Sequence, residues 1–361
     1  MKKRNDTNHG RTMLPAEWEP QGAVMMTWPH AATDWLPYLD EITGTYLQMA
    51  EAIARHEKLI VVSPDKKDTE AKLRARLGEE LVANIIIVEL PTNDTWARDH
   101  GFITLRGSDG SAVLLDFRFN GWGEKFEAGL DNEINRGLLE ALKAGAALRN
   151  EKPLRYESHL DFVLEGGSVE SDGRGTIFTT ASCLLAPRRN QPLTRREIDR
   201  KLRETLRADR IIWLEHGQLA GDDTDGHIDT IVRPCPDDTI LYIRCDDPSD
   251  GHYADFKEME RELQDLRTLD GKPYRLRPLP FPDPIFHDGE RLPATYANFL
   301  VINGAVLAPT YGQPENDAKA IETLQEAFPD REIIPIDSTI IARQHGSIHC
   351  CTMQFPKEMA F

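Results

Sequence analysis

Hydrophobic residues recur along this chain with two different periods, and segments of the two kinds alternate. Apolar residues three and four positions apart predict amphipathic helices, as Ile198, Leu202 and Leu206 illustrate. Six segments share this spacing: residues 40–55, 66–81, 132–144, 194–208, 254–269 and 315–328. Shorter runs rich in β-branched residues predict strands at 23–28, 59–62, 84–90, 210–215 and 331–336. The alternation indicates an α/β fold.

Turn dipeptides fall at nearly constant intervals along the same chain. Residues 299–309, F-L-V-I-N-G-A-V-L-A-P, predict a β-hairpin because Asn-Gly favours a type I′ turn. Comparable turns lie about 63 to 66 residues apart, at Asp109-Gly110, Asp172-Gly173, Asp237-Asp238 and Asn303-Gly304. The segment 348–355 has no following partner, so we expect it to pair with 23–28 as a fifth hairpin that closes a ring of modules. A doubly wound sheet is the alternative, but it does not explain the even spacing.

The bulk properties of the chain change this picture little. Its 361 residues suffice for one large domain, taken as residues 1–361 with residues 1–12 as a flexible N-terminal extension. No apolar run reaches about 18 residues and no apolar core follows the basic N-terminus, so we expect a cytoplasmic protein. A net charge of −17 disfavours nucleic acid and anionic membranes as partners and is compatible with a cationic substrate. The five cysteines, without C-x-x-C spacing, predict no disulfide framework, and homo-oligomerisation is left open.

Polar residues suited to chemistry precede the predicted turns. His227 and Asp229 lie in a run, H-I-D-T-I-V, that we expect to be a strand, and alternation puts both on one face. A carboxylate beside an imidazole raises the pKa of the histidine, which suits proton transfer near neutrality. Trp96 and Asp99 combine an aromatic wall with a carboxylate, which suits a planar cation. Taken alone, the His227–Asp229 pair is more typical of a surface strand, and Trp96 with Asp99 is equally typical of a core tryptophan beside a surface acid.

Three further positions complete the candidate set. Glu165 precedes two glycines, where the backbone can turn sharply and aim a carboxylate at a pocket. Asn298 lies in an otherwise apolar segment that we expect to be a strand, so its amide needs partners among backbone groups or on a ligand. Cys350 and Cys351 lie on an expected strand and face opposite ways, so one of them is structural and the other a candidate nucleophile. Carboxylates suppress the ionisation of a neighbouring thiol, so the set makes sense if the substrate is itself a guanidinium.

These motifs resemble those of the agmatine deiminases and bacterial-type peptidylarginine deiminases, a family of guanidino-group-modifying enzymes. Residues 13–21, M-L-P-A-E-W-E-P-Q, resemble its opening motif, and residues 93–99, N-D-T-W-A-R-D, resemble N-D-x-W-x-R-D. E-G-G at 165–167, G-H-I-D at 226–229 and I-H-C at 348–350 are similar to three more. The resemblance implies a five-bladed pseudo-symmetric α/β propeller, the pentein fold. One departure bears on the substrate: the family typically has G-G-G-N before I-H-C, where this chain has R-Q-H-G-S.

The resemblance also implies hydrolytic deimination without a cofactor or a metal. The implied catalytic residues are Cys350, His227, Asp229, Asp99 and Glu165. Cys350 attacks the guanidinium carbon, the carboxylates hold its nitrogens, and His227 transfers protons. We expect agmatine to give N-carbamoylputrescine and ammonia through an amidino-cysteine intermediate, a step in putrescine synthesis. Peptidyl-arginine is the alternative substrate. The expected substrate-binding residues are Trp96, Asp94 and Asn298.

Other activities are compatible with the same residues. His227, Asp229 and Cys350 are acceptable zinc ligands for metal-assisted hydrolysis. The set can also transfer the amidino group to an amine, or bind a polyamine without turnover. At the distal end of the substrate, the acidic residues Asp94 and Asp34 and the aromatic residues Trp35 and Trp122 lie in segments that could reach the site, and they favour the ammonium of agmatine. Arginines near the site, represented by Arg98 and Arg343, favour a carboxylate instead.

Overall fold

The computed structural model describes residues 12–361 apart from 146, 150 and 151. The extension predicted for residues 1–12 lies outside this range except for Thr12, where strand β1 (Thr12–Met13) begins. All six predicted helices are present, with ends within a few residues of those expected: α1 (Leu39–Ala54), α2 (Lys66–Val82), α5 (Asp131–Ala144), α7 (Arg195–Leu206), α8 (Tyr253–Asp265) and α9 (Pro314–Ala327). Helix α8 ends four residues early because Leu266 is extended and Arg267 forms a β-bridge with Pro273.

Five sheets repeat one pattern of strand pairing. In each, two strands pair antiparallel and a third strand lies parallel to the second; the antiparallel strands are consecutive in four sheets and come from opposite ends of the chain in the fifth. The five sets are β5 (Ile103–Gly107), β6 (Ala112–Arg118) and β7 (Leu154–Val163); β8 (Glu170–Ser171), β9 (Thr176–Thr180) and β10 (Arg210–Leu214); β11 (Val232–Cys235), β12 (Thr239–Arg244) and β13 (Arg275–Pro280); β16 (Leu300–Ile302), β17 (Ala305–Thr310) and β18 (Glu332–Asp337); and β19 (Thr352–Pro356), β2 (Gln21–Thr27) and β3 (Lys58–Ser63). The four predicted turn dipeptides join the first two strands of the first four sets. Strand β4 (Ile85–Glu89) extends the last sheet, and β14 (Phe286–His287) and β15 (Glu290–Arg291) form a separate hairpin.

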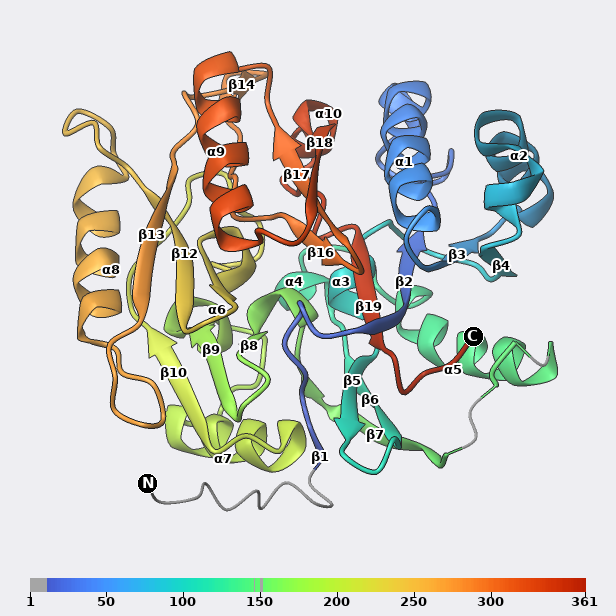
Figure 1. The fold of residues 1–361 in the computed structure, drawn as a ribbon, viewed down its shortest axis with the longest axis horizontal. Helices are drawn as coiled ribbons and strands as arrows, with labels where there is room; N and C mark the ends of the chain where they lie inside the picture. Colours follow the sequence, from blue (N-terminus) through green and yellow to red (C-terminus); the bar gives the residue numbers. More distant parts are fainter. Residues whose placement is uncertain (1–11, 146, 150–151) are drawn as a thin grey trace.

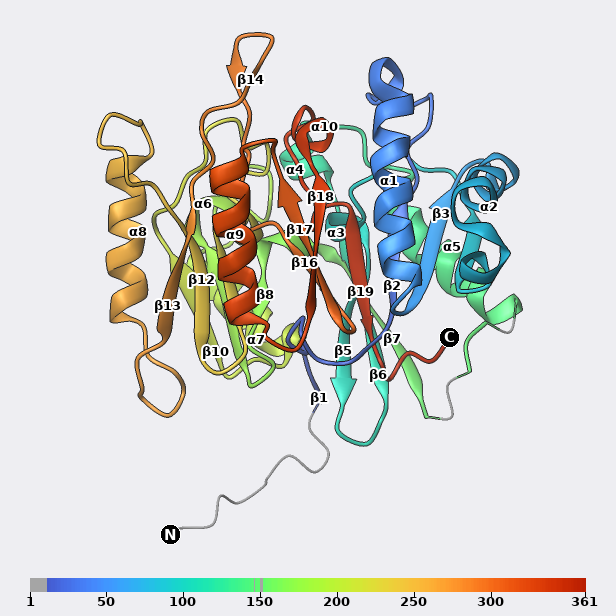
Figure 2. The same cartoon turned by 45° about the horizontal axis from the view of Figure 1, so that its top comes forward.

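The two ends of the described chain meet in one sheet, as the sequence predicts. Strand β19 pairs antiparallel with β2, so that Met353 faces Met25 across the ladder. Figures 1 and 2 show β19 beside β2 in both orientations. Within the described residues the five sheets are separate hydrogen-bonded units, so the observed fold is a mixed α/β fold of repeated modules. Their arrangement as a closed five-bladed ring stays a prediction.

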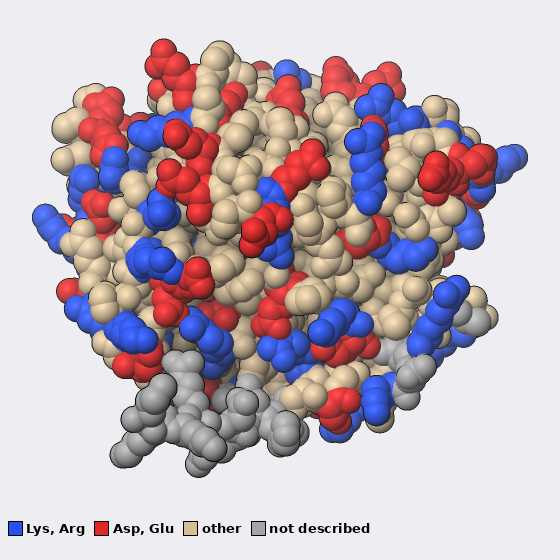
Figure 3. Space-filling model, viewed as in Figure 1, with Lys and Arg blue, Asp and Glu red and all other residues tan. Residues whose placement is uncertain are grey.

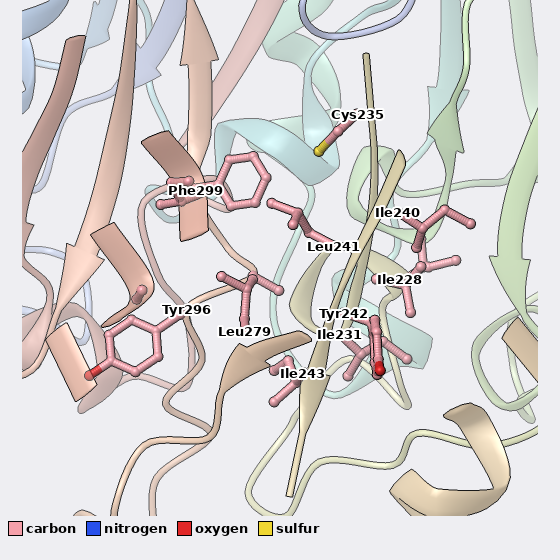
Figure 4. Packing of buried hydrophobic residues seen from close by; sticks show 14 of the residues in the cluster. Ile228, Ile231, Cys235, Ile240, Leu241, Tyr242, Ile243, Leu279, Tyr296 and Phe299 are labelled. Atoms are coloured by element: carbon pink, nitrogen blue, oxygen red, sulfur yellow. The ribbon is translucent and has the colours of Figure 1, made fainter. Parts of the chain in front are cut away.

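The long helices lie on the outside of the molecule, and the strands lie between them (Figures 1 and 2). The largest apolar cluster packs Leu241 of β12 against Leu279 of β13 and Phe299, all at most 1% exposed (Figure 4). Burial of such a side chain contributes about 1.5–3 kcal/mol to stability. Because interiors of this kind are close-packed, the segments joining the strands are held in fixed positions.

The surface carries both signs of charge. Acidic and basic side chains are interspersed over the face shown in Figure 3. Of the helices in the described ranges, none combines the length and the apolar composition needed to cross a membrane.

Candidate active site

A short turn precedes the antiparallel strand pair of each of the five sheets, and the predicted site residues lie in these turns or beside them. The turns are helix α3 (Ala97–His100) before β5, η2 (Gly166–Ser168) before β8, η3 (Ile228–Thr230) before β11, residues 296–299 before β16 and residues 346–351 before β19. Helix α3 contacts η2, and η2 contacts η3. The Arg98 N–H donates to the Cys350 carbonyl over 3.1 Å, and the His349 N–H to the Asn298 carbonyl over 3.2 Å. Repetition of the module therefore brings the five turns to one place.

His227 and Asp229 do not lie on a strand, so the predicted local structure is wrong. His227 precedes the 3-10 turn η3, and the strand starts only at Val232. The buried Ile228 and a hydrogen bond of 2.8 Å from the Thr230 hydroxyl to the His227 carbonyl stabilise this turn. Both side chains nevertheless reach the same site: a Cβ on Gly167 would lie 2.6 Å from His227 Nδ1 and 3.1 Å from Asp229 Oδ2.

The two adjacent cysteines also lie in a turn, since β19 begins only at Thr352. They still point in different directions, as predicted from a strand. Cys350 lines a pocket open to solvent. Cys351 is fully buried in an apolar cluster beside Tyr46. Position therefore distinguishes Cys350 as the thiol that a ligand can reach.

Asp99 is fixed by one partner from its own module and one from the next. Its Oδ2 accepts a hydrogen bond of 3.0 Å from the indole of Trp122, and its Oδ1 accepts one of 3.0 Å from the Gly167 N–H. His227 Nδ1 lies 3.7 Å from Asp99 Oδ1. Trp122 was expected from the sequence to reach the site, but its hydrogen bond to Asp99 was not predicted. Its indole limits the directions in which the carboxylate can point.

Glu165 is completely buried and paired with an internal arginine. Arg189 Nε donates to Glu165 Oε1 over 2.7 Å, and Arg189 Nη1 lies 2.7 Å from Asp225 Oδ2. The second carboxylate oxygen, Oε2, has no hydrogen-bond partner within the described residues. Arg189, absent from the sequence-based prediction, thus orients Glu165 and leaves one oxygen for a ligand.

Asn298 connects the thiol to the η3 turn. It lies in the loop before β16 rather than in a strand, because the strand starts at Leu300. Its Oδ1 accepts from the Cys350 N–H over 3.2 Å and from the Cys350 thiol over 3.3 Å. Its Nδ2 donates to the Asp229 carbonyl over 3.4 Å. The buried amide therefore has its partners in the protein and holds the thiol in place.

Burial controls the protonation of the site. It lowers the pKa of His227 to about 3 despite the nearby charge of Asp229, so the predicted rise is wrong: desolvation of the imidazolium outweighs the attraction. Burial, together with the charges of Asp229 and Asp99, raises the pKa of Cys350 well above its usual value. Burial and the carboxylates of Asp229 and Glu165 likewise raise the pKa of Asp99. Without a ligand, the imidazole is neutral and the thiol is protonated.

The pocket that leads to Cys350 has a volume of about 260 Å³ and a mixed aromatic and acidic lining. Trp96 and Trp122 form a wall, with ring centroids 6.4 Å apart. Asp34, Asp94 and Asp223 also line it. The remaining lining residues are Asp99, Phe126, Thr224, Arg343, Gln344, His345 and Gly346.

Asp94 is held by the indole of Trp96, which donates to its Oδ2 over 3.0 Å, and burial raises the pKa of Asp94 to about 6. Arg98 and Arg343, the two arginines that would favour a carboxylate at the distal end of the substrate, differ in position. Arg98 is buried behind the site, where its Nε donates to the His349 carbonyl over 3.3 Å. Arg343 lies at the pocket, and its guanidinium sits 4.9 Å from the ring of Tyr38.

The predicted zinc ligands do not form a compact group. Within the described residues, the His, Cys, Asp and Glu groups whose ligand atoms lie within 4.8 Å of one another are Glu165, Cys183 and His227, and Glu17, Glu170 and His349. Each group already contacts an arginine: Arg189 pairs with Glu165, and Arg233 pairs with Glu17 and Glu170. Because these guanidinium groups repel a cation, neither group suits a metal ion.

Comparison with known proteins gives consistent results over nearly the whole chain. Residues 13–356 match the model of the Porphyromonas-type peptidyl-arginine deiminase family. Agmatine deiminase from Pseudomonas aeruginosa UCBPP-PA14 is 35% identical, with 95% of both chains covered. A structure from Porphyromonas gingivalis, provisionally described as an arginine deiminase, is 50% identical, with a TM-score of 0.88 over 97% of this chain and 100% of the other. Agmatine deiminase from C. jejuni, with substrate bound, is 35% identical, with a TM-score of 0.85 over 96% of both chains.

Proposed function

Because the chain belongs to the Porphyromonas-type peptidyl-arginine deiminase family, we propose that it hydrolyses agmatine to N-carbamoylputrescine and ammonia. The relatives named agmatine deiminase, which align with almost the full chain, support this assignment. In this proposal the five modules surround one axis, and the turns before their hairpins form the active site. The product is a precursor of putrescine.

One observation carries the proposal: unpartnered buried polar atoms lie beside Asp99, a residue that lines the pocket leading to Cys350. Asp229 Oδ1, Glu165 Oε2 and both ring nitrogens of His227 have no hydrogen-bond partner among the described residues. A buried acceptor without a donor costs about 1–3 kcal/mol, and more if it is charged. A guanidinium is planar, cationic and rich in N–H donors, so it can bond to both carboxylate oxygens and to the ring nitrogen of His227 that carries no proton.

The first half of the reaction forms a covalent adduct. The arriving guanidinium brings the positive charge that the buried thiol lacks, and it opposes the rise in the pKa of Cys350. The neutral His227 accepts the thiol proton, and the Cys350 sulfur then bonds to the guanidinium carbon. His227 returns that proton to an amino group, the C–N bond breaks, and ammonia leaves. A positively charged S-alkylthiouronium group remains on Cys350.

The second half releases the product. His227, neutral again, takes a proton from water, and the resulting hydroxide oxygen bonds to the thiouronium carbon. The C–S bond breaks and Cys350 leaves with the electron pair as a thiolate, which takes up the hydroxyl proton as the carbon becomes a neutral ureido carbonyl. His227 gives its proton to solvent, and the resting state is restored. Asp99, Asp229 and Glu165 hold the nitrogens throughout. These steps depend on the positions in which the turns hold the side chains, and no atom changes its oxidation state.

The lining of the pocket favours a free amine at the distal end of the substrate. Asp34, Asp94 and Asp223 suit the ammonium of agmatine, and the indoles of Trp96 and Trp122 suit its methylene chain. Peptidyl-arginine is the second candidate. The family's description and the presence of Arg343 at the pocket favour it, since a guanidinium can bind a carboxylate there.

A substrate comparison tests the proposal. Agmatine and a blocked arginine peptide are each incubated with the protein in the absence of added amines, and ammonia and the ureido product are measured. We expect kcat/KM for agmatine to be at least about tenfold higher, a difference of about 1.4 kcal/mol. Cys350→Ala should abolish turnover, whereas the matched variant Cys351→Ala should retain much of it. A preference for the peptide would show that peptidyl-arginine, and not agmatine, is the substrate. Activity in Cys350→Ala would show that another residue is the nucleophile.

A further inference from the structure

Two sequence motifs that the proposed reaction leaves without a role meet behind the active site. His349 comes from the turn before β19, and Glu17 comes from the opening motif at residues 13–21, which runs between β1 and β2. His349 Nδ1 lies 2.6 Å from Asp229 Oδ2, and His349 Nε2 lies 2.7 Å from Glu17 Oε2. All three side chains are nearly or fully buried. The ring thus links a carboxylate of the site to a carboxylate outside it.

The geometry requires a doubly protonated ring. An ionised carboxylate oxygen accepts hydrogen bonds and donates none, so each of the two contacts needs an N–H from the imidazole. A neutral ring would place a lone pair against one of the carboxylates in a buried environment. Other charged groups lie near this ring on three elements: Glu170 on β8, Arg98 on α3 and Arg233 on β11. Glu17 and Asp229 contact the ring directly. Arg233 holds Glu17, with Nη2 2.6 Å from Glu17 Oε2.

The effect of this chain of contacts falls on Asp229. Burial alone would raise the pKa of Asp229, but the hydrogen bond and the charge of His349 hold it below the usual value. The bond engages Oδ2, while Oδ1 has no hydrogen-bond partner in the part of the chain that the structure describes. Asp99, a carboxylate of the same site without a histidine bond, has a raised pKa. Contact with His349 therefore accounts for the opposite directions in which the pKa values of Asp229 and Asp99 are shifted.

We propose that Glu17 and His349 are positioning residues that keep Asp229 ionised and its Oδ1 directed at the guanidinium of the substrate. The inference rests on the proposed function, because it assigns Asp229 a guanidinium to bind. It also gives a reason for the opening motif: Glu17 keeps the His349 ring charged, and Arg233 keeps Glu17 in place. Neither residue touches the substrate.

A purely structural role makes a different prediction, and Glu170 supplies the control. Glu170 is also buried and also pairs with Arg233, with Oε1 2.7 Å from Nε. The structure records no hydrogen bond from it to His349 among the described residues. Burial raises the pKa of Glu170 to about 7, so its replacement by glutamine changes the charge less. If Glu17 only anchors Arg233, Glu17→Gln and Glu170→Gln should behave alike.

The test measures agmatine binding as a function of pH by calorimetry, with Cys350→Ala as the background so that no turnover occurs. His349→Gln retains an N–H for Asp229 but removes the charge, and Glu17→Gln removes the outer carboxylate. We expect Kd to rise at least about tenfold in both variants, and the acid limb of binding to move to higher pH. The direction follows because Asp229 without its cation takes up a proton at higher pH. Glu170→Gln, which removes a nearby charge but no hydrogen bond to the ring, should shift both quantities much less than Glu17→Gln does.

Kinetic measurements on the protein with Cys350 intact give a second readout. His349→Gln and Glu17→Gln should raise KM more than they lower kcat, with melting temperatures close to that of Glu170→Gln. Unchanged Kd and KM in the two variants, or equal changes in Glu170→Gln, overturn the inference. Should one variant fail to fold, the other decides. Failure of the unmodified protein to release ammonia from agmatine would instead refute the proposed function itself.

Discussion

At the scale of single residues, the environment of a side chain decides its chemistry more than its neighbours in sequence do. His227 and Asp229 are two positions apart, yet burial shifts the histidine toward its neutral form. Cys350 and Cys351 are adjacent, yet only Cys350 lines the pocket. A protonated thiol and a neutral imidazole form a resting state that a cationic ligand must activate.

That resting state predicts a preference among electrophiles. Chloroacetamidine is cationic and chloroacetamide is neutral, while the two are otherwise alike. Because the pKa of Cys350 is raised, we expect chloroacetamide to react slowly at pH 7 and faster as the pH rises and the thiolate forms. Chloroacetamidine, which supplies a cation between the carboxylates, should alkylate Cys350 at least about tenfold faster at pH 7.

The measurement is the rate of mass increase, normalised to the rate for a small free thiol. In Asp229→Asn, chloroacetamidine should no longer react faster than chloroacetamide, because the variant lacks the carboxylate charge near Cys350 that attracts the cationic reagent. Equal normalised rates for the two reagents would contradict activation by a cationic ligand.

At the scale of elements, the turn before each hairpin determines how closely the site can be packed. The E-G-G segment shows this clearly, since η2 brings its backbone against three functional side chains. A Cβ on Gly167 would lie 2.6 Å from His227 Nδ1 and 3.0 Å from Asp99 Oδ1. Any side chain at position 167 would therefore displace His227 or Asp99 from the positions they occupy in the site.

Gly167→Ala should therefore lower kcat/KM for agmatine by about a hundredfold or more, because displacements of about 1 Å have effects of that size. The matched control is Gly44→Ala in α1, where an added Cβ meets no atom within 4 Å. It should leave activity unchanged and raise stability by about 0.5–1 kcal/mol, since alanine is the better helix former. Steady-state kinetics and thermal unfolding of both variants provide the comparison. Full activity in Gly167→Ala would show that the turn can shift to accommodate a Cβ without displacing His227 and Asp99.

At the scale of the whole molecule, the net charge of −17 and the acidic pocket act together on a cationic substrate. Long-range attraction raises the rate of encounter and is screened by salt over about 10 Å at 0.1 M. Agmatine carries two positive charges at neutral pH, and a blocked arginine peptide carries one.

We expect kcat/KM for agmatine to fall several-fold between about 0.02 and 0.5 M NaCl, and more steeply than for the peptide. The value of kcat at saturating agmatine should change little, because encounter no longer limits the rate. An equal salt dependence for the two substrates would argue against recognition of the distal ammonium by Asp34, Asp94 and Asp223.

The sequence by itself determined the elements, their repetition and the identity of the residues that converge. Periodicity of apolar positions is a local property, so helices such as α7 and hairpins such as β16–β17 could be predicted within a few residues. The same repetition indicated that residues before each turn would share a site, and the Cys350 turn, η2 and η3 do meet. The pairing of the last strand with β2 could also be predicted, because no strand follows the last segment that could pair with it.

Only the tertiary structure decided protonation, orientation and the partners of the site residues. The contact between Glu17 and His349 joins positions 332 residues apart, and Arg189 reaches Glu165 from a loop without a motif. The strand predicted for His227 and Asp229 is a turn, because the burial of Ile228 and the bond from Thr230 override a short alternating pattern. Shifts in pKa depend on desolvation and on charges brought close by folding, and neither quantity can be calculated from the order of residues along a chain.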